Sequence, residues 1–120
     1  MTQISTHVLD IGRGVPAAGI AVELFAAATP STETRSAAAW MSLGAGETDG
    51  DGRVAGLAGP DGASPGLHRL VFTIGDYQRR QGADPVFIEE TSFSFDVRAQ
   101  ERLHIPMLLS AYGLSIYRGS

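Results

Sequence analysis

Short segments in which apolar and polar residues alternate make up much of this chain. The segment "TSFSFDVR" at 91–98 shows the pattern most plainly, because Phe93, Phe95 and Val97 alternate with polar residues. Alternation with a period of two is typical of a strand with one buried face. The segment "ISTHVLD" at 4–10 alternates in the same way and is predicted to be a strand as well.

Glycine, proline and small polar residues separate the alternating segments and predict turns or loops, among them 11–19 and 29–36. Alanine clusters at 26–28 and 37–39 favour helix by propensity. Pro30 and a polar loop stand between them, however, and neither reaches the roughly ten residues at helical spacing that a helix needs. Further strands are therefore predicted at 20–27, 37–48, 53–58, 67–74 and, on either side of a hinge near 111–113, within 103–120.

One short helix is predicted at 75–84. Asp76 lies in its first turn, arginines follow toward its end, and Gly82 and Pro85 stop it. About eight short strands with a single short helix favour an all-β sandwich. The length of 120 residues predicts a single domain over 1–120, with enough chain to bury one apolar core.

Composition excludes several classes of function. The chain has no cysteine, so disulfides, thiolate zinc sites and cysteine nucleophiles are absent, and it has no lysine to form a Schiff base. A net charge of -4 without a basic stripe argues against nucleic-acid binding. No apolar run approaches the roughly 18 residues that span a bilayer, and the first residues do not resemble a signal peptide. We therefore expect neither a nucleic-acid partner nor a membrane partner.

The three histidines are the candidates for acid–base chemistry. His7 shares a strand face with Ser5, and His104 shares one with Pro106. Each histidine taken alone is more often structural than catalytic, and His68 is expected to be an exposed residue at the start of a strand. Histidines without carboxylate neighbours at ligand spacing make a weak metal site, so no metal is expected.

Arg53 closes the segment "DGDGR". Asp49 and Asp51 in this segment raise the possibility of a calcium loop, but the EF-hand pattern fails, because Arg53 and Pro60 stand where it needs ligands. A turn is predicted instead. Arg53 then begins the next strand, where a solvated side chain is the plainest expectation.

The chain ends on "YRGS", residues 117–120. Tyr117 follows Ser115 by two residues and is expected to share its strand face, whereas Arg118 faces the other way unless the strand breaks at Gly119. The local sequence pattern leaves two alternatives open for this tetrapeptide: an ordered element of a site, or a frayed chain end.

Four stretches occur in order: "ISTHVLDIGRGVPAAGIAVEL", "TDGDGR", "HRLVFTIGDYQRRQG" and "HIPMLLSAYGLSIYRGS". They resemble the 5-hydroxyisourate hydrolase branch of the transthyretin-related proteins over essentially the whole chain. A terminal Tyr-Arg-Gly-Ser after a His-hydrophobic-Pro strand separates this branch from the hormone-carrying transthyretins. The resemblance implies a prealbumin-like sandwich of two four-stranded sheets. It also implies a homotetramer, a dimer of dimers, with active sites at the dimer–dimer interface.

The resemblance further implies an activity and a site. The activity is hydrolysis of 5-hydroxyisourate at the N1–C6 bond to 2-oxo-4-hydroxy-4-carboxy-5-ureidoimidazoline, in urate degradation, with no cofactor. Leu114 and Ile116 depart from the usual family pattern and are expected to affect packing more than catalysis. The implied catalytic residues are His7, Arg53 and His104, and the implied substrate-binding residues are Tyr117, Arg118, Gly119 and Ser120.

Two other functions are weighed against the hydrolase. A small-ligand carrier on the same fold needs an apolar channel and gains nothing from two histidines and an arginine, whose desolvation costs free energy. A structural or cell-surface sandwich is disfavoured by the missing signal peptide. The enzyme is therefore favoured, and a prokaryotic source would imply a cytoplasmic location.

Overall fold

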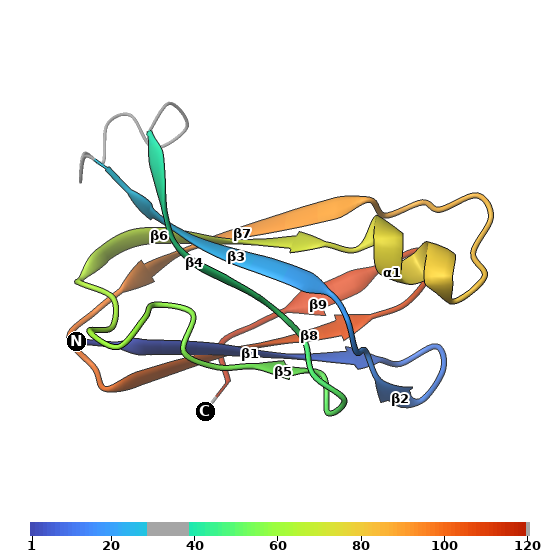
Figure 1. Ribbon diagram of the computed structural model, residues 1–120, viewed down its shortest axis with the longest axis horizontal. Helices are drawn as coiled ribbons and strands as arrows, with labels where there is room; N and C mark the ends of the chain where they lie inside the picture. Colours follow the sequence, from blue (N-terminus) through green and yellow to red (C-terminus); the bar gives the residue numbers. More distant parts are fainter. Residues whose placement is uncertain (29–38, 120) are drawn as a thin grey trace.

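Two β-sheets packed face to face form the body of the protein in the computed structural model, which describes residues 1–28 and 39–119 (Figure 1). The strands are β1 (Gln3–Asp10), β2 (Val15–Pro16), β3 (Ala21–Ala27), β4 (Trp40–Glu47), β5 (Arg53–Val54), β6 (Gly66–Thr73), β7 (Glu90–Val97), β8 (Arg102–Leu109) and β9 (Leu114–Ile116), and the helix is α1 (Gly75–Arg80). One sheet has the order β2-β1-β8-β9 with β5 also paired to β1, and the other has the order β4-β3-β6-β7. The expected sandwich with one short helix is confirmed, and β5 gives the first sheet one strand more than the four expected.

Most predicted elements lie where the alternation placed them, with three corrections and one part left open. The turn predicted at 11–19 contains the two-residue strand β2, which pairs with β1. The strand predicted at 53–58 ends at Val54, because the chain turns at Gly56, which has a φ of 68°, and Gly59 N–H donates to the Gly56 carbonyl. The helix ends at Arg80, four residues earlier than predicted, and Gly82 follows with a φ of 93°. The loop predicted at 29–36 and the first residues of the strand predicted at 37–48 lie outside the described residues.

The core lies between the two sheets and is built from the inward face of each strand. Ile4 and Val8 of β1 are fully buried, and Phe72 of β6 and Met107 of β8 belong to the same buried cluster, also with no exposed surface. Burial of each such side chain contributes about 1.5–3 kcal/mol, so the alternating faces hold the sandwich together. Leu114 and Ile116 pack against this core, which confirms the expectation that they act in packing.

The pairing of β1 with β8 brings the beginning and the end of the chain together. These two strands are parallel, and their register runs from Gln3 beside Arg102 to Asp10 beside Leu109. All other strand pairs among the described residues are antiparallel. Residues that are far apart in sequence therefore share one outer face of the first sheet.

His68 is buried, contrary to the expectation of an exposed residue. It is 3% exposed, because β6 begins at Gly66 and the period of two then turns His68 inward with Leu70. Its Nδ1–H donates to the Gly66 carbonyl at 2.9 Å, and its ring stacks on Phe95. The local carbonyl satisfies the imidazole, so His68 is a structural histidine of the core.

A buried hydrogen-bonded group ties the helix to the end of β1. The hydroxyl of Tyr77, which is 1% exposed, donates to Asp10 Oδ2 at 2.7 Å. The backbone N–H of Arg13 donates to the other carboxylate oxygen at 3.0 Å. Burial, followed by the hydrogen bond to Asp10, raises the pKa of Tyr77. Asp10 therefore depends on Tyr77 for one of its two described side-chain partners.

Tyr77→Phe is expected to lower the free energy of unfolding by about 1–3 kcal/mol, because it leaves a buried carboxylate oxygen without its donor. Urea denaturation at a fixed protein concentration measures the change. Tyr112→Phe removes the same atom from a side chain that is 78% exposed, and it should leave the midpoint unchanged. Equal midpoints for Tyr77→Phe and the unmodified protein would show that the bond contributes nothing.

Candidate functional site

The candidate site lies on the outer face of the first sheet. Ser5 and His7 project from β1 on this face, while Ile4, Thr6 and Val8 point into the core. The face expected for His7 and Ser5 is thereby confirmed.

The neighbouring strand β8 completes the face. His104 and Pro106 are partly exposed there, whereas Ile105 is buried. The parallel register places Ser5 beside His104, and it places His7 beside Pro106. Both histidines consequently occupy adjacent strands on one surface, although 97 positions separate them in the chain.

The imidazole of His104 is held at two of its edges. Its Nδ1 lies 2.8 Å from Ser5 Oγ, within hydrogen-bond distance. On the Cδ2 edge the backbone of Gly119 packs so closely that a Cβ there would lie 3.0 Å from Cδ2. Nε2 has no hydrogen-bond partner among the described residues. A serine hydroxyl can donate or accept, so His104 keeps its Ser5 partner when Nδ1 carries the proton.

The surroundings of His104 favour its neutral form. Burial lowers the pKa of His104 below its ordinary value of 6.5, and the positive charges of His7 and Arg53 lower it further. A histidine with a lowered pKa is unprotonated at neutral pH. Its free Nε2 can then accept a proton from water or from a bound ligand.

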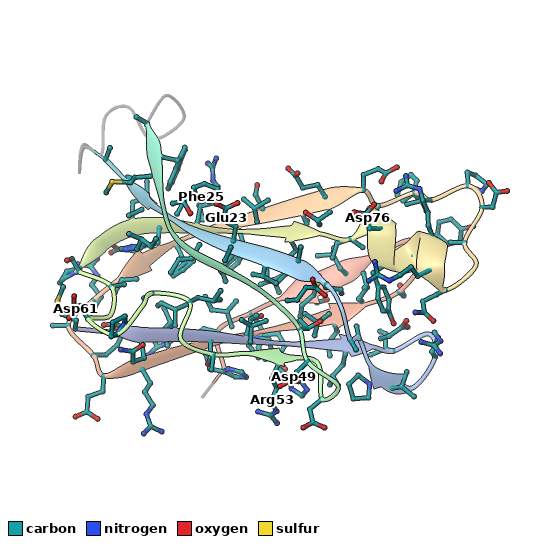
Figure 2. The ribbon with its side chains drawn as sticks, in the orientation of Figure 1. Glu23, Phe25, Asp49, Arg53, Asp61 and Asp76 are labelled. Carbon is teal, nitrogen blue, oxygen red and sulfur yellow. The ribbon has the colours of Figure 1, made fainter. Side chains whose placement is uncertain are left out.

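Arg53 reaches the same surface through a tight turn. Asp49 Oδ1 accepts the backbone N–H groups of Asp51 and Arg53 at 2.9 and 3.0 Å, and the bond from Arg53 is the main reason that the pKa of Asp49 is lowered. Gly52 has a φ of 77°, and a Cβ there would lie 2.4 Å from the Val8 carbonyl, so only glycine fits. The predicted turn is confirmed. Figure 2 shows Asp49 and Arg53 side by side below β1 and β5, away from the second sheet.

His7 is the cross-strand partner of Arg53. Its Nε2 lies 2.8 Å from the Asp51 carbonyl oxygen, which can only accept. Nε2 therefore carries a hydrogen, and a neutral His7 keeps its lone pair on Nδ1. The turn that places Arg53 also fixes the tautomer of His7.

The end of the chain follows β8 back toward His104. Tyr117 N–H donates to the Pro106 carbonyl at 3.2 Å, and Gly119 N–H donates to the His104 carbonyl at 2.8 Å. In Figure 1 the C-terminal end leaves β9 on the side that faces away from the second sheet. Through residue 119 this segment is ordered and bound to β8 rather than frayed. Ser120 lies outside the described residues.

These elements line a cavity of about 690 Å³ that is open to the outside on one side. The residues that line it are Ser5, Arg53, Arg102, His104, Arg118 and Gly119. Four of the predicted site residues are thus brought together, and Arg118 reaches the cavity because the regular strand ends at Ile116. His7 stands beside Arg53 without lining the cavity, and Tyr117 is 48% exposed and also lies outside the lining.

Sequence analysis did not single out Ser5 or Arg102 as site residues. Each lies two positions before a predicted histidine, on the same strand face. Period-two spacing from His7 and from His104 was the available signal. It could not show that Ser5 contacts His104, since that contact depends on the pairing of two distant strands.

Among residues 1–28 and 39–119 no group of three or more histidine, aspartate or glutamate side chains could hold a metal ion. No helix in the same part of the chain is long and apolar enough to cross a membrane.

Known proteins resemble this chain in both sequence and structure. The 5-hydroxyisourate hydrolase of Caulobacter vibrioides is 38% identical over 124 residues and covers all of both chains. The structure of Klebsiella pneumoniae 5-hydroxyisourate hydrolase superposes with a TM-score of 0.78 at 29% identity, again covering all of both chains. Transthyretin from Sparus aurata has a TM-score of 0.81 at 22% identity over 97% of this chain and 95% of its own, which shows a shared fold.

The HIUase/Transthyretin family matches residues 4–119, a span that includes both strands of the outer face and the segment that closes the cavity. The chain therefore belongs to the HIUase/Transthyretin family.

Proposed function

We propose that this protein hydrolyses 5-hydroxyisourate in urate degradation, opening its six-membered ring at the N1–C6 bond to give 2-oxo-4-hydroxy-4-carboxy-5-ureidoimidazoline. The observation that carries the proposal is that Arg53, His104 and the Arg118–Gly119 segment meet in one cavity. Relatives named for this hydrolysis match the whole chain. Hydrolysis of a cyclic amide is accelerated by a base for water and by positive charge or hydrogen-bond donors at the carbonyl oxygen, and the cavity supplies a base and positive charge.

His104 is the general base in this proposal. Water attacks the carbonyl carbon as His104 Nε2 takes one of its protons, while Nδ1–H donates to Ser5 Oγ. The lowered pKa keeps His104 unprotonated and ready at neutral pH. His7 orients the water through Nδ1, because its Nε2–H is bonded to the Asp51 carbonyl.

Arg53 stabilises the negative charge that develops on the carbonyl oxygen. Its guanidinium is always protonated and lies at the cavity beside the neutral base. The C–N bond then breaks, the leaving nitrogen takes the proton from His104, and the new carboxyl group ionises. Arg118, which also lines the cavity, binds the substrate, with Tyr117 and Ser120 as proposed hydrogen-bonding groups of the same tetrapeptide.

A carrier function is disfavoured by the charge of the cavity. Three arginines and one histidine line it. An apolar ligand would strip water from these groups without replacing its hydrogen bonds, and that desolvation costs free energy. The shared fold with a transthyretin of 22% identity does not by itself favour either function.

We also propose a homotetramer, a dimer of dimers, with the sites at the dimer–dimer interface. The sheet edges support it: β9 and β7 end their sheets with no strand on their outer side among the described residues. Such edges present unpaired backbone groups that readily pair with a second chain. In this assembly a second copy would cover the cavity.

The first test generates 5-hydroxyisourate in the cuvette with urate oxidase and follows its ultraviolet absorbance. The protein should accelerate decay. His104→Ala removes the general base and His7→Ala removes the group that orients the water, so each should lower kcat/KM at least about 100-fold. Circular dichroism and light scattering check that each variant keeps the fold and assembly. Decay at the spontaneous rate with folded unmodified protein would reject the proposed function, and full activity in either variant would remove that histidine from the mechanism.

The pH profile of kcat/KM is expected to fall on its acid side with an apparent pKa below 6.5. Neutral His104 is the active form, and its pKa is lowered, so activity is lost only as pH falls through that lowered value. Arg53→Gln removes one cause of the lowering and should raise the pKa of His104 in an NMR titration. Arg79→Gln removes the same charge from helix α1 and should leave it unchanged. An unchanged pKa of His104 in Arg53→Gln would exclude electrostatic coupling between Arg53 and His104.

Gly119→Ala should reduce kcat/KM by about tenfold to a hundredfold, since the new Cβ would lie 3.0 Å from His104 Cδ2 and must displace the ring or the tail. Gly113→Ala adds the same methyl group where the nearest described atom is Ser110 Oγ at 3.9 Å, and it should retain activity. Comparable rates in both variants would show that the close contact of Gly119 with His104 is not needed.

A further inference from the structure

Positive charge is concentrated in the cavity. Arg53, Arg102 and Arg118 all line it, and none of the described lining residues is an aspartate or a glutamate. The chain as a whole carries a net charge of -4, with nine arginines and no lysine. A third of its arginines therefore face one cavity on an acidic protein, an arrangement that attracts anions.

Arg102 has no role in the proposed hydrolysis. It is the first residue of β8, exposed and on the same outer face as His104. Two residues of strand separate their Cα atoms by about 6.6 Å. None of the ion pairs among the described residues involves Arg102.

The strand register places Arg102 and Arg53 toward opposite ends of β1, on either side of His104, which stands beside Ser5. Arg102 stands beside Gln3, whereas Arg53 stands beside His7, four positions further along β1. The positive charges that lower the pKa of His104 are those of His7 and Arg53. The groups that act on His104 thus lie toward one end of β1, and Arg102 lies toward the other.

Amide hydrolysis supplies an anion for Arg102. The water oxygen bonds to the carbonyl carbon, the C–N bond breaks, the nitrogen takes a proton, and the new carboxylic acid loses its proton. A ring without a carboxylate becomes a product that carries one. The planar fork of a guanidinium matches a carboxylate with two parallel hydrogen bonds.

We propose that Arg102 binds the carboxylate of the ring-opened product, so that a ureide with a carboxylate binds more tightly than the same ureide without one. This assignment rests on the proposed function for the identity of the product. Arg102 acts on binding and on product release, and it takes no part in proton transfer.

Calorimetric titration with orotate and with uracil tests the proposal. These two probes share one cyclic ureide ring and differ by a carboxylate. Wild-type protein should bind orotate more tightly than uracil. Arg102→Gln should lower the affinity for orotate about tenfold, as expected for the loss of one exposed charged hydrogen bond, and it should leave the affinity for uracil unchanged. Arg102→Lys keeps the charge and should retain part of the affinity.

Arg98→Gln is the matched control. Arg98 is 84% exposed, pairs with Asp96 and lies outside the cavity lining, so its loss changes the net charge equally and should not alter orotate binding. The proposal is overturned by any of four results: no measurable orotate binding to wild type, equal binding of the two probes, equal losses for both probes in Arg102→Gln, or an equal loss in Arg98→Gln. Binding is measured without turnover, so a protein that discriminates the probes but does not accelerate 5-hydroxyisourate decay would refute the proposed function alone.

Discussion

The parallel pairing of β1 with β8 is the contact on which the rest of the structure depends. It sets residues 99 positions apart side by side along eight consecutive pairs. A buried hydrogen bond of 2.6 Å from Thr6 Oγ1 to the Ile105 carbonyl joins the same strands. Through this pairing Ser5 reaches His104, and the chain end can fold back along the far edge of β8.

The register of these two strands determines both which side chains enter the core and which side chains form the candidate site. Side chains alternate along a strand, so a shift of one residue would turn Ile4 and Val8 outward and turn Ser5 and His7 into the core. Each displaced core side chain would lose about 1.5–3 kcal/mol of burial, and the buried polar groups would add a further cost. The apolar face thereby fixes the positions of the polar face, and the site needs no separate scaffold.

Sequence alone predicted most of the strands and the faces of His7 and His104, because alternation is a local property. It misplaced His68, since the start of β6 determines the phase of the alternation and the turn before it is glycine- and proline-rich. Alternation put Arg118 on the opposite face unless the strand broke, and Arg118 reaches the cavity because the regular strand does stop, at Ile116. The contact of Ser5 with His104 was beyond local patterns, as it requires knowledge of which strands pair. The residues assigned to catalysis came from family resemblance, and the structure adds their distances and hydrogen bonds.

One sandwich can serve different chemistry because its outer face contributes little to its core. The inward residues fix the fold, while the outward positions beside β1 and β8 can change without disturbing them. An apolar outer face in this place would suit a carrier, because a bound ligand would then replace water at little cost. Here the face holds guanidinium groups beside a histidine of lowered pKa. Charged groups of this kind are costly to strip of water, and hydrolysis needs water beside a neutral base and a positive charge, so the same desolvation cost that disfavours an apolar ligand favours an enzyme.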